Sequence, residues 1–285
     1  MTSTPLRQIV SGADPLAIDI DVVNELLCGF LKEEIGKAGF ERAVVGVSGG
    51  VDSALVAALA CRSLGPENVL GIIMPYRASN PASERDARAV CEQLRLEPLL
   101  MDISPQIDAY FERFPDAGSG RRGNKMARER MTILYDQSWA FHGLVLGTSN
   151  KTEMLLGYST IFGDMAHALN PLGDLYKTQV YALARSVDLP QAVLDKAPSA
   201  DLWEGQTDED ELGLRYALVD MLLYYLVDER RTRPELRVLG YDDEVIDDVM
   251  RRVRTSQYKR RPPLIAKLTA RTIDREFRYP RDWGA

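Results

Sequence analysis

Residues 48–53 of this 285-residue chain read Ser-Gly-Gly-Val-Asp-Ser and could bind a phosphate group. Two adjacent glycines let the backbone bend tightly, and they leave room for an anion to approach the amide groups. Ser48 and Ser53 offer hydroxyls to phosphate oxygens, and Asp52 offers a carboxylate that Mg²⁺ could share with those oxygens. The turn lacks the lysine of a G-x-x-x-x-G-K-[ST] loop, so it does not match the loop used in γ-phosphoryl transfer. We therefore interpret the stretch as a pyrophosphate-binding turn.

The segments on either side of the turn would hold it in place. Residues 43–47 are an apolar run typical of a buried strand, and residues 54–63 show an alanine-rich helical pattern. A helix that begins directly after the turn would point its positive N-terminal end at the anion. The alternative is an ordinary glycine turn, but it does not account for the two serines or for the strand and helix beside them.

This signature resembles that of the ATP pyrophosphatases, which cleave ATP between its α and β phosphates and adenylate a substrate oxygen. The resemblance implies AMP and pyrophosphate as products. A tRNA-thiolating enzyme of the same family would need catalytic cysteines and a basic RNA-binding face, which the sequence does not offer. A nucleotide sensor without turnover is the rival from another class, but a sensor need not keep a pair of metal-binding carboxylates.

Composition excludes several classes of protein. At 285 residues and 45% hydrophobic, the chain can bury the core of one α/β domain with a helical addition. A net charge of −7 argues against a nucleic-acid partner bound through a basic face. Cys28, Cys61 and Cys91 are scattered, so they predict neither a disulfide framework nor a zinc site and fit a reducing cytoplasm. The sequence shows neither a signal-peptide pattern nor a run of 18 apolar residues, so we expect no membrane segment.

Apolar runs alternate with helical patterns along the chain. Strands are expected at residues 43–47, 69–74, 98–103 and 144–147, and helices at 19–40, 54–63, 83–94, 125–141, 208–228 and 242–254. This order predicts an α/β fold, a doubly wound parallel sheet with flanking helices. We expect one domain over residues 1–285, with an N-terminal helix (19–40), an ATP-binding α/β core (41–190) and a C-terminal helical part with a tail (191–285).

Local signals add three expectations. Ser83 is predicted to cap the helix that it begins. Residues 114–126 are rich in glycine and charge and are the best candidate for a mobile loop. Residues 148–153 follow a predicted buried strand, at the sheet edge where open parallel sheets bind their ligands.

Seven segments in the same order, from about residue 31 to residue 261, are similar to those of NAD synthetase. They are S-G-G-V-D-S, K-M-A-R-E-R-M, L-G-T-S-N-K-T-E with L-L-G-Y, G-D-M, P-L-G-D-L-Y-K-T-Q-V, A-P-S-A-D-L and Y-K-R-R-P-P. The resemblance implies an adenine nucleotide alpha hydrolase-like fold and a two-step reaction. ATP adenylates the nicotinic acid carboxylate of deamido-NAD, and ammonia then displaces AMP to give NAD. It also implies a magnesium-dependent ligase of NAD biosynthesis, usually a homodimer.

Site residues follow from the resemblance by position. The ATP-binding residues would be Gly46, Val47, Ser48, Gly49, Gly50, Val51, Asp52, Ser53, Thr148, Lys177 and Ser199. Those for deamido-NAD would be Arg128, Tyr258 and Lys259. Asp52 and Glu153 would bind Mg²⁺, and together with Lys177 they would form the catalytic set.

Several of these residues have ordinary alternatives. Glu153 could be a helix-capping carboxylate, and Arg128 with Arg130 could form a salt-bridged helix face. His142 and His167 are interpreted as packing or surface residues, because adenylation needs no histidine.

The chain also departs from the family at two positions. Ile161 and Ala168 stand where many members carry a lysine and an aspartate that contact deamido-NAD. Recognition of the nicotinic acid end must therefore use other groups.

The nitrogen donor is a separate question. Residues 163–165 resemble the synthetase domains of glutamine-dependent members, but only about 30 to 40 residues precede the match, too few for a glutaminase domain. None of the three cysteines has a base or oxyanion arrangement around it in sequence. We expect ammonia as the donor. The alternatives are a synthetase subunit fed by a separate glutaminase and another ATP-pyrophosphatase amidotransferase, such as one resembling GMP synthetase.

Overall fold

The computed structural model describes residues 14–198, 213–261 and 263–273. Its centre is a four-stranded sheet in the order β3-β2-β1-β4, in which every neighbouring pair is parallel. The strands are β1 (Arg42–Gly46), β2 (Val69–Ile73), β3 (Leu99–Leu100) and β4 (Gly143–Val145). The predicted doubly wound parallel sheet with flanking helices is confirmed.

Side chains of β1 alternate between the two faces of the sheet. Ala43 and Val45 belong to one hydrophobic cluster, whereas Val44 belongs to another cluster on the opposite face. All three are fully buried. A strand covered on both faces has no polar side, and this explains the uninterrupted apolar run in the sequence.

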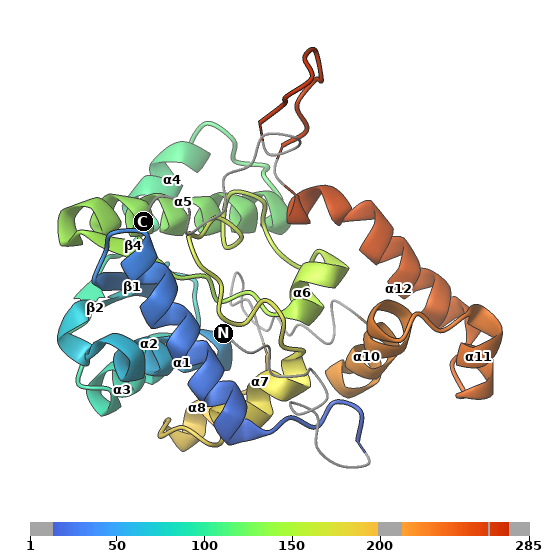
Figure 1. Ribbon diagram of the computed structural model, residues 1–285. Coiled ribbons are helices and arrows are strands. Elements are labelled where there is room, and N and C mark those ends of the chain that lie inside the picture. The colour runs from blue at the N-terminus through green and yellow to red at the C-terminus, as the bar shows by residue number, and fades with distance from the viewer. Residues whose placement is uncertain (1–13, 199–212, 262, 274–285) are drawn as a thin grey trace.

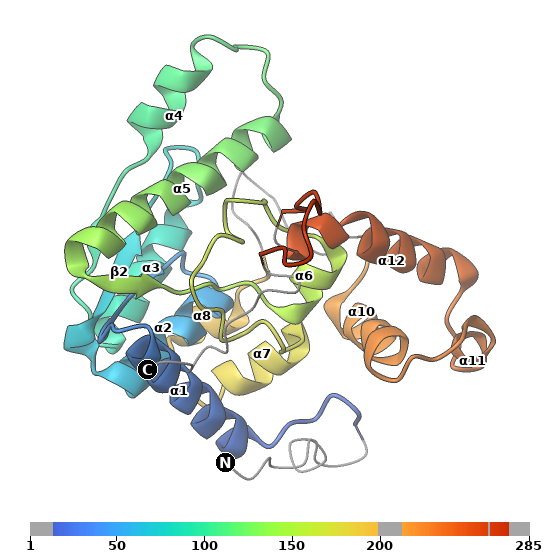
Figure 2. The same cartoon turned by 45° about the horizontal axis from the view of Figure 1, so that its top comes forward.

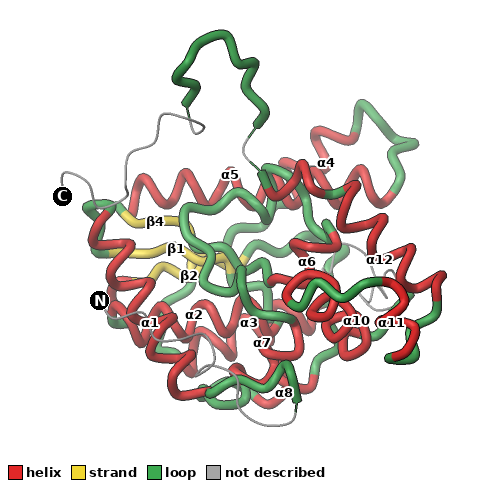
Figure 3. The backbone as a smooth tube through the Cα atoms, turned by 45° about the vertical axis from the view of Figure 1, so that its right-hand side comes forward, coloured by secondary structure: helices red, strands yellow, loops and turns green. Residues whose placement is uncertain are grey.

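Helices cover both faces (Figures 1 and 3). On one side lie α1 (Ile20–Lys37), α2 (Val51–Leu64), α3 (Pro81–Gln93), α7 (Lys177–Ala184) and α8 (Gln191–Asp195), and on the other lie α4 (Ser104–Phe111) and α5 (Ser119–Phe141). The short 3-10 helix η2 (Pro66–Asn68) leads into β2.

A further group of helices lies beside the sheet (Figure 2). It consists of α6 (Lys151–Leu156), α10 (Tyr216–Leu223), the π-helical turn η3 (Tyr224–Asp228), α11 (Arg233–Val238), α12 (Asp243–Thr255) and the 3-10 turn η4 (Gln257–Arg260). These helices share their own hydrophobic cluster, which includes Leu156 of α6, Leu222 of α10 and Ile246 of α12. Tyr176, directly before α7, packs into the same cluster and joins the helical group to the sheet.

The sheet order places two chain segments side by side. The connections between β1, β2 and β3 run through α2 and α3 on one face, whereas the connection from β3 to β4 runs through α4 and α5 on the other. The connections therefore change face between β1 and β4, which are hydrogen-bonded neighbours. Ligands of open parallel sheets bind at such a switch point, beyond the carboxyl ends of the strands. Residues 47–50 and 146–150 leave the sheet there.

The prediction of a mobile loop at residues 114–126 is wrong for most of its length, because α5 begins at Ser119. Arg122 donates hydrogen bonds from Nε to the carbonyl of Ala117 (3.1 Å) and from Nη2 to that of Pro115 (3.4 Å). The Arg121 guanidinium lies 4.2 Å from the centre of the Phe114 ring. These contacts stabilise a helical turn that glycine content alone disfavours.

Ser83 does not cap α3, so that prediction is also wrong. Asn80 is the cap, because its Oδ1 accepts a hydrogen bond from the Ala82 amide at 2.9 Å and Pro81 occupies the first helical position. Ser83 is buried, and its hydroxyl accepts a hydrogen bond from Lys196 Nζ at 3.0 Å.

Other boundaries are narrower than predicted. The strand expected over 98–103 is reduced to Leu99–Leu100 at the edge of the sheet. Of the helix expected over 208–228, residues 208–212 lie outside the described part, and α10 begins at Tyr216. Within the described ranges, none of the helices has the length and apolar content needed to span a bilayer.

Candidate active site

The turn after β1 is closed by its own serines. The Ser53 hydroxyl accepts a hydrogen bond from the Ser48 amide (3.1 Å), lies 3.0 Å from the Ser48 hydroxyl and donates to the Gly50 carbonyl (3.0 Å). The Gly50 amide donates to Ser48 Oγ at 3.3 Å. The turn is therefore held in its bent shape before any ligand binds.

Gly49 is required by the backbone and by a close neighbour. Its φ is +79°, a left-handed conformation that side chains disfavour. A Cβ atom at this position would lie 2.3 Å from the Ser83 carbonyl oxygen and 3.1 Å from the Ala87 amide nitrogen. Helix α3 therefore packs directly against the turn. Lys196 strengthens this packing from the end of α8, because it also forms an ion pair with Asp86 at 3.0 Å.

Beside the turn, Lys177 joins two carboxylates. Its Nζ lies 2.5 Å from Asp52 Oδ2 and 3.2 Å from Glu153 Oε1, and its side chain is 3% exposed. Lys177 lies in the first turn of α7, Asp52 in that of α2 and Glu153 in that of α6. The structure thus brings the three predicted catalytic residues into one cluster at the switch point, with Lys177 buried and the two carboxylates half-buried.

Asn150 completes this cluster and was missed by the sequence analysis. Its Nδ2 donates to Asp52 Oδ1 at 3.0 Å, and its Oδ1 accepts from the Glu153 amide at 3.0 Å. Glu153 Oε2 in turn accepts from the Asn150 amide at 3.3 Å, which completes a capping box at the start of α6. Glu153 therefore has both the structural role given as its alternative and a place beside Lys177. The N-x-x-E pattern was the available signal.

A third carboxylate, beside this cluster, was also missed. Asp220 of α10 is fully buried, and its Oδ1 accepts from the Thr152 hydroxyl at 2.5 Å while its Oδ2 accepts from the Thr178 amide at 2.8 Å. Burial raises the pKa of Asp220, and these hydrogen bonds oppose the shift. A single acid inside the apolar sequence of α10 was the signal for it.

Two of the residues predicted for deamido-NAD contact the segment between α6 and residue 170. Arg128 Nε donates to the Ile161 carbonyl at 3.2 Å. Lys259 Nζ donates to the carbonyls of Gly157 (2.8 Å) and Ser159 (2.7 Å). Burial lowers the pKa of Lys259, and the nearby Asp164 carboxylate opposes that shift. The side chain of Tyr258 is 62% exposed.

The remaining predicted residues lie as follows. Gly46 ends β1, Val47 and Val51 are buried on either side of the turn, and half-buried Thr148 lies in the segment between β4 and α6. Ser199 lies outside the described residues.

The two histidines pack against residues outside the Asp52, Glu153 and Lys177 cluster, namely Phe40 and Gly147. His142 ends α5, with its ring centre 5.0 Å from that of Phe40. His167 is half-buried, and burial lowers its pKa.

The cluster fits a magnesium ion only if a substrate supplies ligands. In the described part of the chain, no three or more His, Cys, Asp or Glu side chains group as a metal site would require. Mg²⁺ in nucleotide enzymes is commonly held by one or two carboxylates together with phosphates and water. Asp52 and Glu153 meet at one ammonium group and provide two such carboxylates.

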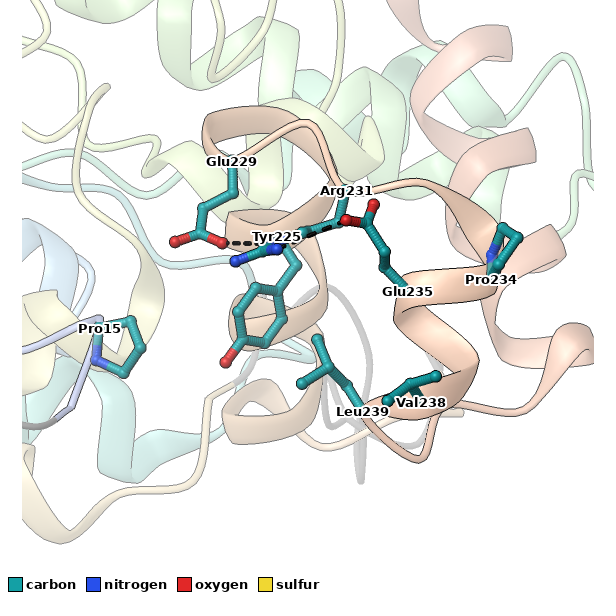
Figure 4. Close-up of a pocket in the computed structure, with 8 residues that line it drawn as sticks. All are labelled: Pro15, Tyr225, Glu229, Arg231, Pro234, Glu235, Val238 and Leu239. Atoms are coloured by element: carbon teal, nitrogen blue, oxygen red, sulfur yellow. Dashed lines mark hydrogen bonds and ion pairs between the residues drawn. The ribbon is translucent and has the colours of Figure 1, made fainter.

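A groove on the helical group is distinct from this cluster (Figure 4). It is lined by Pro15, Tyr225, Glu229, Arg231, Pro234, Glu235, Val238 and Leu239. Arg231 lies between Glu229 and Glu235, 2.7 Å and 3.5 Å from their carboxylates. None of the predicted site residues lines the groove, so it is separate from the phosphate turn and its charged neighbours.

Comparisons with known proteins show the family of the chain. The family model for NAD synthase matches residues 23–263. An NH3-dependent NAD+ synthetase of Trichlorobacter lovleyi is 57% identical over 269 residues, which cover 94% of this chain and 98% of that protein.

Two solved structures have similar folds. The NH3-dependent NAD synthetase of Campylobacter jejuni, in complex with nitrate, is 35% identical with a TM-score of 0.75, and the match covers 88% of this chain and 100% of that one. The NMN synthetase of Francisella tularensis is 31% identical with a TM-score of 0.78, and the match covers 87% and 99%. From the site geometry and these matches, we conclude that the chain belongs to the NAD synthase family.

Proposed function

We propose that this protein is an ammonia-dependent NAD synthase. The nicotinic acid carboxylate of deamido-NAD attacks the α-phosphorus of ATP, and the bond to pyrophosphate breaks. Ammonia then attacks the acyl carbon of the adenylate, loses a proton and displaces AMP. The observation that carries the proposal is the cluster of buried Lys177 with Asp52 and Glu153 beside a preformed phosphate turn, in a chain of the NAD synthase family.

The chemistry explains why such a site is needed. A carboxylate is a poor electrophile, and its conversion to a mixed anhydride supplies a leaving group. The protein must position the reactants and neutralise the charge on the phosphates. In our proposal the turn binds pyrophosphate through its amides, and Lys177 donates to phosphate oxygens. Asp52 and Glu153 would hold Mg²⁺, which would neutralise further phosphate charge when bound.

We propose that residues of the chain contribute to the binding of deamido-NAD in two ways. Arg128 and Tyr258 are exposed and would contact deamido-NAD directly. Lys259 would act mainly by holding the segment near Gly157 and Ser159, because its ammonium group already donates to both carbonyls. This arrangement would compensate for the apolar residues at positions 161 and 168. Among the residues outside the described part, Ser199 would complete the ATP site.

A product assay on the purified chain tests the reaction. With ATP, deamido-NAD, Mg²⁺ and ammonium, we expect NAD, AMP and pyrophosphate in equal amounts. ADP as the main product would contradict the proposal. Nicotinic acid mononucleotide is the informative comparison substrate, given the similar fold of the Francisella tularensis NMN synthetase. Faster amidation of the mononucleotide would show that the substrate assignment is wrong.

The nitrogen donor is tested in the same assay by replacing ammonium with glutamine. We expect turnover by the pure chain with ammonium and none with glutamine, because none of the three cysteines is presented as an activated nucleophile. Cys91 is buried, Cys28 and Cys61 are half-buried, and burial raises the pKa of Cys61 to about 12. Turnover with glutamine only after addition of cell extract would indicate a separate glutaminase subunit.

We further propose a homodimer in the cytoplasm. Helix α5 presents Tyr135 and Trp139, which are 44% and 89% exposed, one turn apart on its outer surface. An interface over this face would cover both rings. Light scattering on Trp139→Glu should then give the monomer mass, and Leu26→Glu, at a position of α1 that is 46% exposed, is the matched control. A Trp139→Glu protein that is still dimeric would exclude this face of α5 as the dimer interface.

The proposed cytoplasmic location is tested separately, by fractionation of cells.

A further inference from the structure

Asp220 is a buried carboxylate in a helix that otherwise buries apolar side chains. Its neighbours Val219, Leu222 and Leu223 on α10 are fully buried and belong to the hydrophobic cluster of the helical group. Burial of a carboxylate has a large desolvation cost, and an apolar residue would usually fill such a place at lower cost. Packing of α10 alone therefore does not explain an acid at this position.

The hydrogen bonds of Asp220 reach two other helices at their first turns. Oδ1 accepts from the Thr152 hydroxyl of α6 at 2.5 Å, and Oδ2 accepts from the Thr178 amide of α7 at 2.8 Å. Thr152 Oγ1 also accepts from the Lys177 amide at 3.0 Å. One carboxylate thus joins the N-terminal turns of α6 and α7, where the amide groups favour a negative charge.

These contacts involve the immediate neighbours of the catalytic set. Thr152 directly precedes Glu153, and Thr178 directly follows Lys177. One turn before Asp220 on the same helix, the Tyr216 ring centre lies 5.5 Å from Lys177 Nζ. Helix α10 therefore contacts the start of α7 in two ways. Asp220 accepts a hydrogen bond from the Thr178 amide, and the Tyr216 ring lies against the side chain of Lys177.

We propose that Asp220 and Thr152 are positioning residues for adenylation, and this inference rests on the proposed function. They fix the spacing between the carboxylate of Glu153 and the ammonium group of Lys177, so that both face Asp52. Neither residue itself contacts substrate. They are expected to affect the rate of adenylation only by orienting Glu153 and Lys177. Residues that orient the ligands of a metal site affect activity in the same indirect way.

The first experiment measures adenylation as exchange of labelled pyrophosphate into ATP in the presence of deamido-NAD. Thr152→Val keeps the shape of the side chain but removes the hydroxyl, and Asp220→Asn keeps the shape but removes the charge. We expect each to lower the exchange rate about 10- to 100-fold. Thr152→Ser should restore most of the rate, because the hydroxyl is kept.

Leu222→Ala is the matched structural control. Leu222 lies on α10, is fully buried and belongs to the apolar cluster. Its truncation should lower the melting temperature at least as much as Thr152→Val does, with an exchange rate near wild type at a temperature where both variants are folded. If Leu222→Ala lowers the exchange rate as strongly as Thr152→Val, the loss reflects general destabilisation and the proposal is wrong.

A double-mutant cycle gives the sharper readout. In a Lys177→Met background, adding Thr152→Val should cause little further loss of exchange, because the group that Thr152 positions is already absent. Independent losses that multiply would overturn the inference. The exchange activity of the wild-type protein separates the two proposals. If the wild-type protein shows no pyrophosphate exchange, the proposed function is refuted. If the wild-type protein is active and Thr152→Val is equally active, only the positioning role is refuted.

Discussion

Replacement of Gly49 by alanine tests the geometry of the phosphate turn most directly. Alanine in the left-handed conformation at φ +79° costs about 1 to 2 kcal/mol. The added Cβ would also lie 2.3 Å from the Ser83 carbonyl oxygen, which is backbone and cannot rotate away. Relief of this overlap adds about 1 to 3 kcal/mol. The sum of roughly 2 to 5 kcal/mol corresponds to a fall in melting temperature of roughly 4 to 20 °C for a protein of this size.

Gly50→Ala is the matched control for that variant. Gly50 has φ −96°, and the nearest heavy atom to its added Cβ is Ser48 Oγ at 3.4 Å, an ordinary contact distance. In ligand-free buffer, calorimetry should therefore show a stability loss for Gly49→Ala and almost none for Gly50→Ala. If Gly49→Ala melted within about 1 °C of the wild type, the close packing of α3 on the turn would be refuted.

Three further predictions concern the site and the thiols of Cys61 and Cys91. Glu153→Gln should keep the capping box and the melting temperature but raise the Mg²⁺ concentration needed for pyrophosphate release, and full activity at low Mg²⁺ would exclude the proposed metal role. Arg128→Ala should raise the KM for deamido-NAD far more than that for ATP, and initial-rate kinetics in which both rise equally would contradict its assignment. Burial raises the pKa of Cys61 to about 12 and that of Cys91 to about 11, from an ordinary value of 9.0. As pH rises, the thiols of the unfolded chain therefore ionise before those of the folded protein. The free energy of unfolding should fall between about pH 9 and 12. Denaturant titrations should show a smaller fall for the double variant Cys61→Ala, Cys91→Ala.

The sequence predicted the central part of the fold well because its signals are local there. The apolar run of β1, the Gly-Gly turn and the alanine-rich start of α2 are contiguous, and each has a direct backbone meaning. The first turns of α5 were not predictable in this way. Their helical conformation depends on contacts of Arg121 and Arg122 with residues 111–117, and glycine content indicates the opposite.

In the candidate site, too, some residues could be predicted from the sequence and others could not. Asp52, Glu153 and Lys177 could be named from the resemblance, and the structure brings them together. Asn150 and Asp220 were missed because their importance arises from contacts between helices that the sequence does not display. An asparagine before a helix reads as a cap, and one acid in an apolar helix has no evident partner until Thr152 and Thr178 are seen beside it.

The parallel order of the sheet has a consequence for the kinetics of folding. The contact between Asp52 and Lys177 spans 125 positions of the chain, that between Asp52 and Asn150 spans 98, and that between Thr152 and Asp220 spans 68. Contacts between positions so far apart require closure of long loops and form slowly. The turn at residues 48–53 is a local structure that can form early, but its charged neighbours can arrive only after α7 and α10 have docked. During refolding, recovery of ATP binding should therefore lag behind the recovery of helix content measured by circular dichroism.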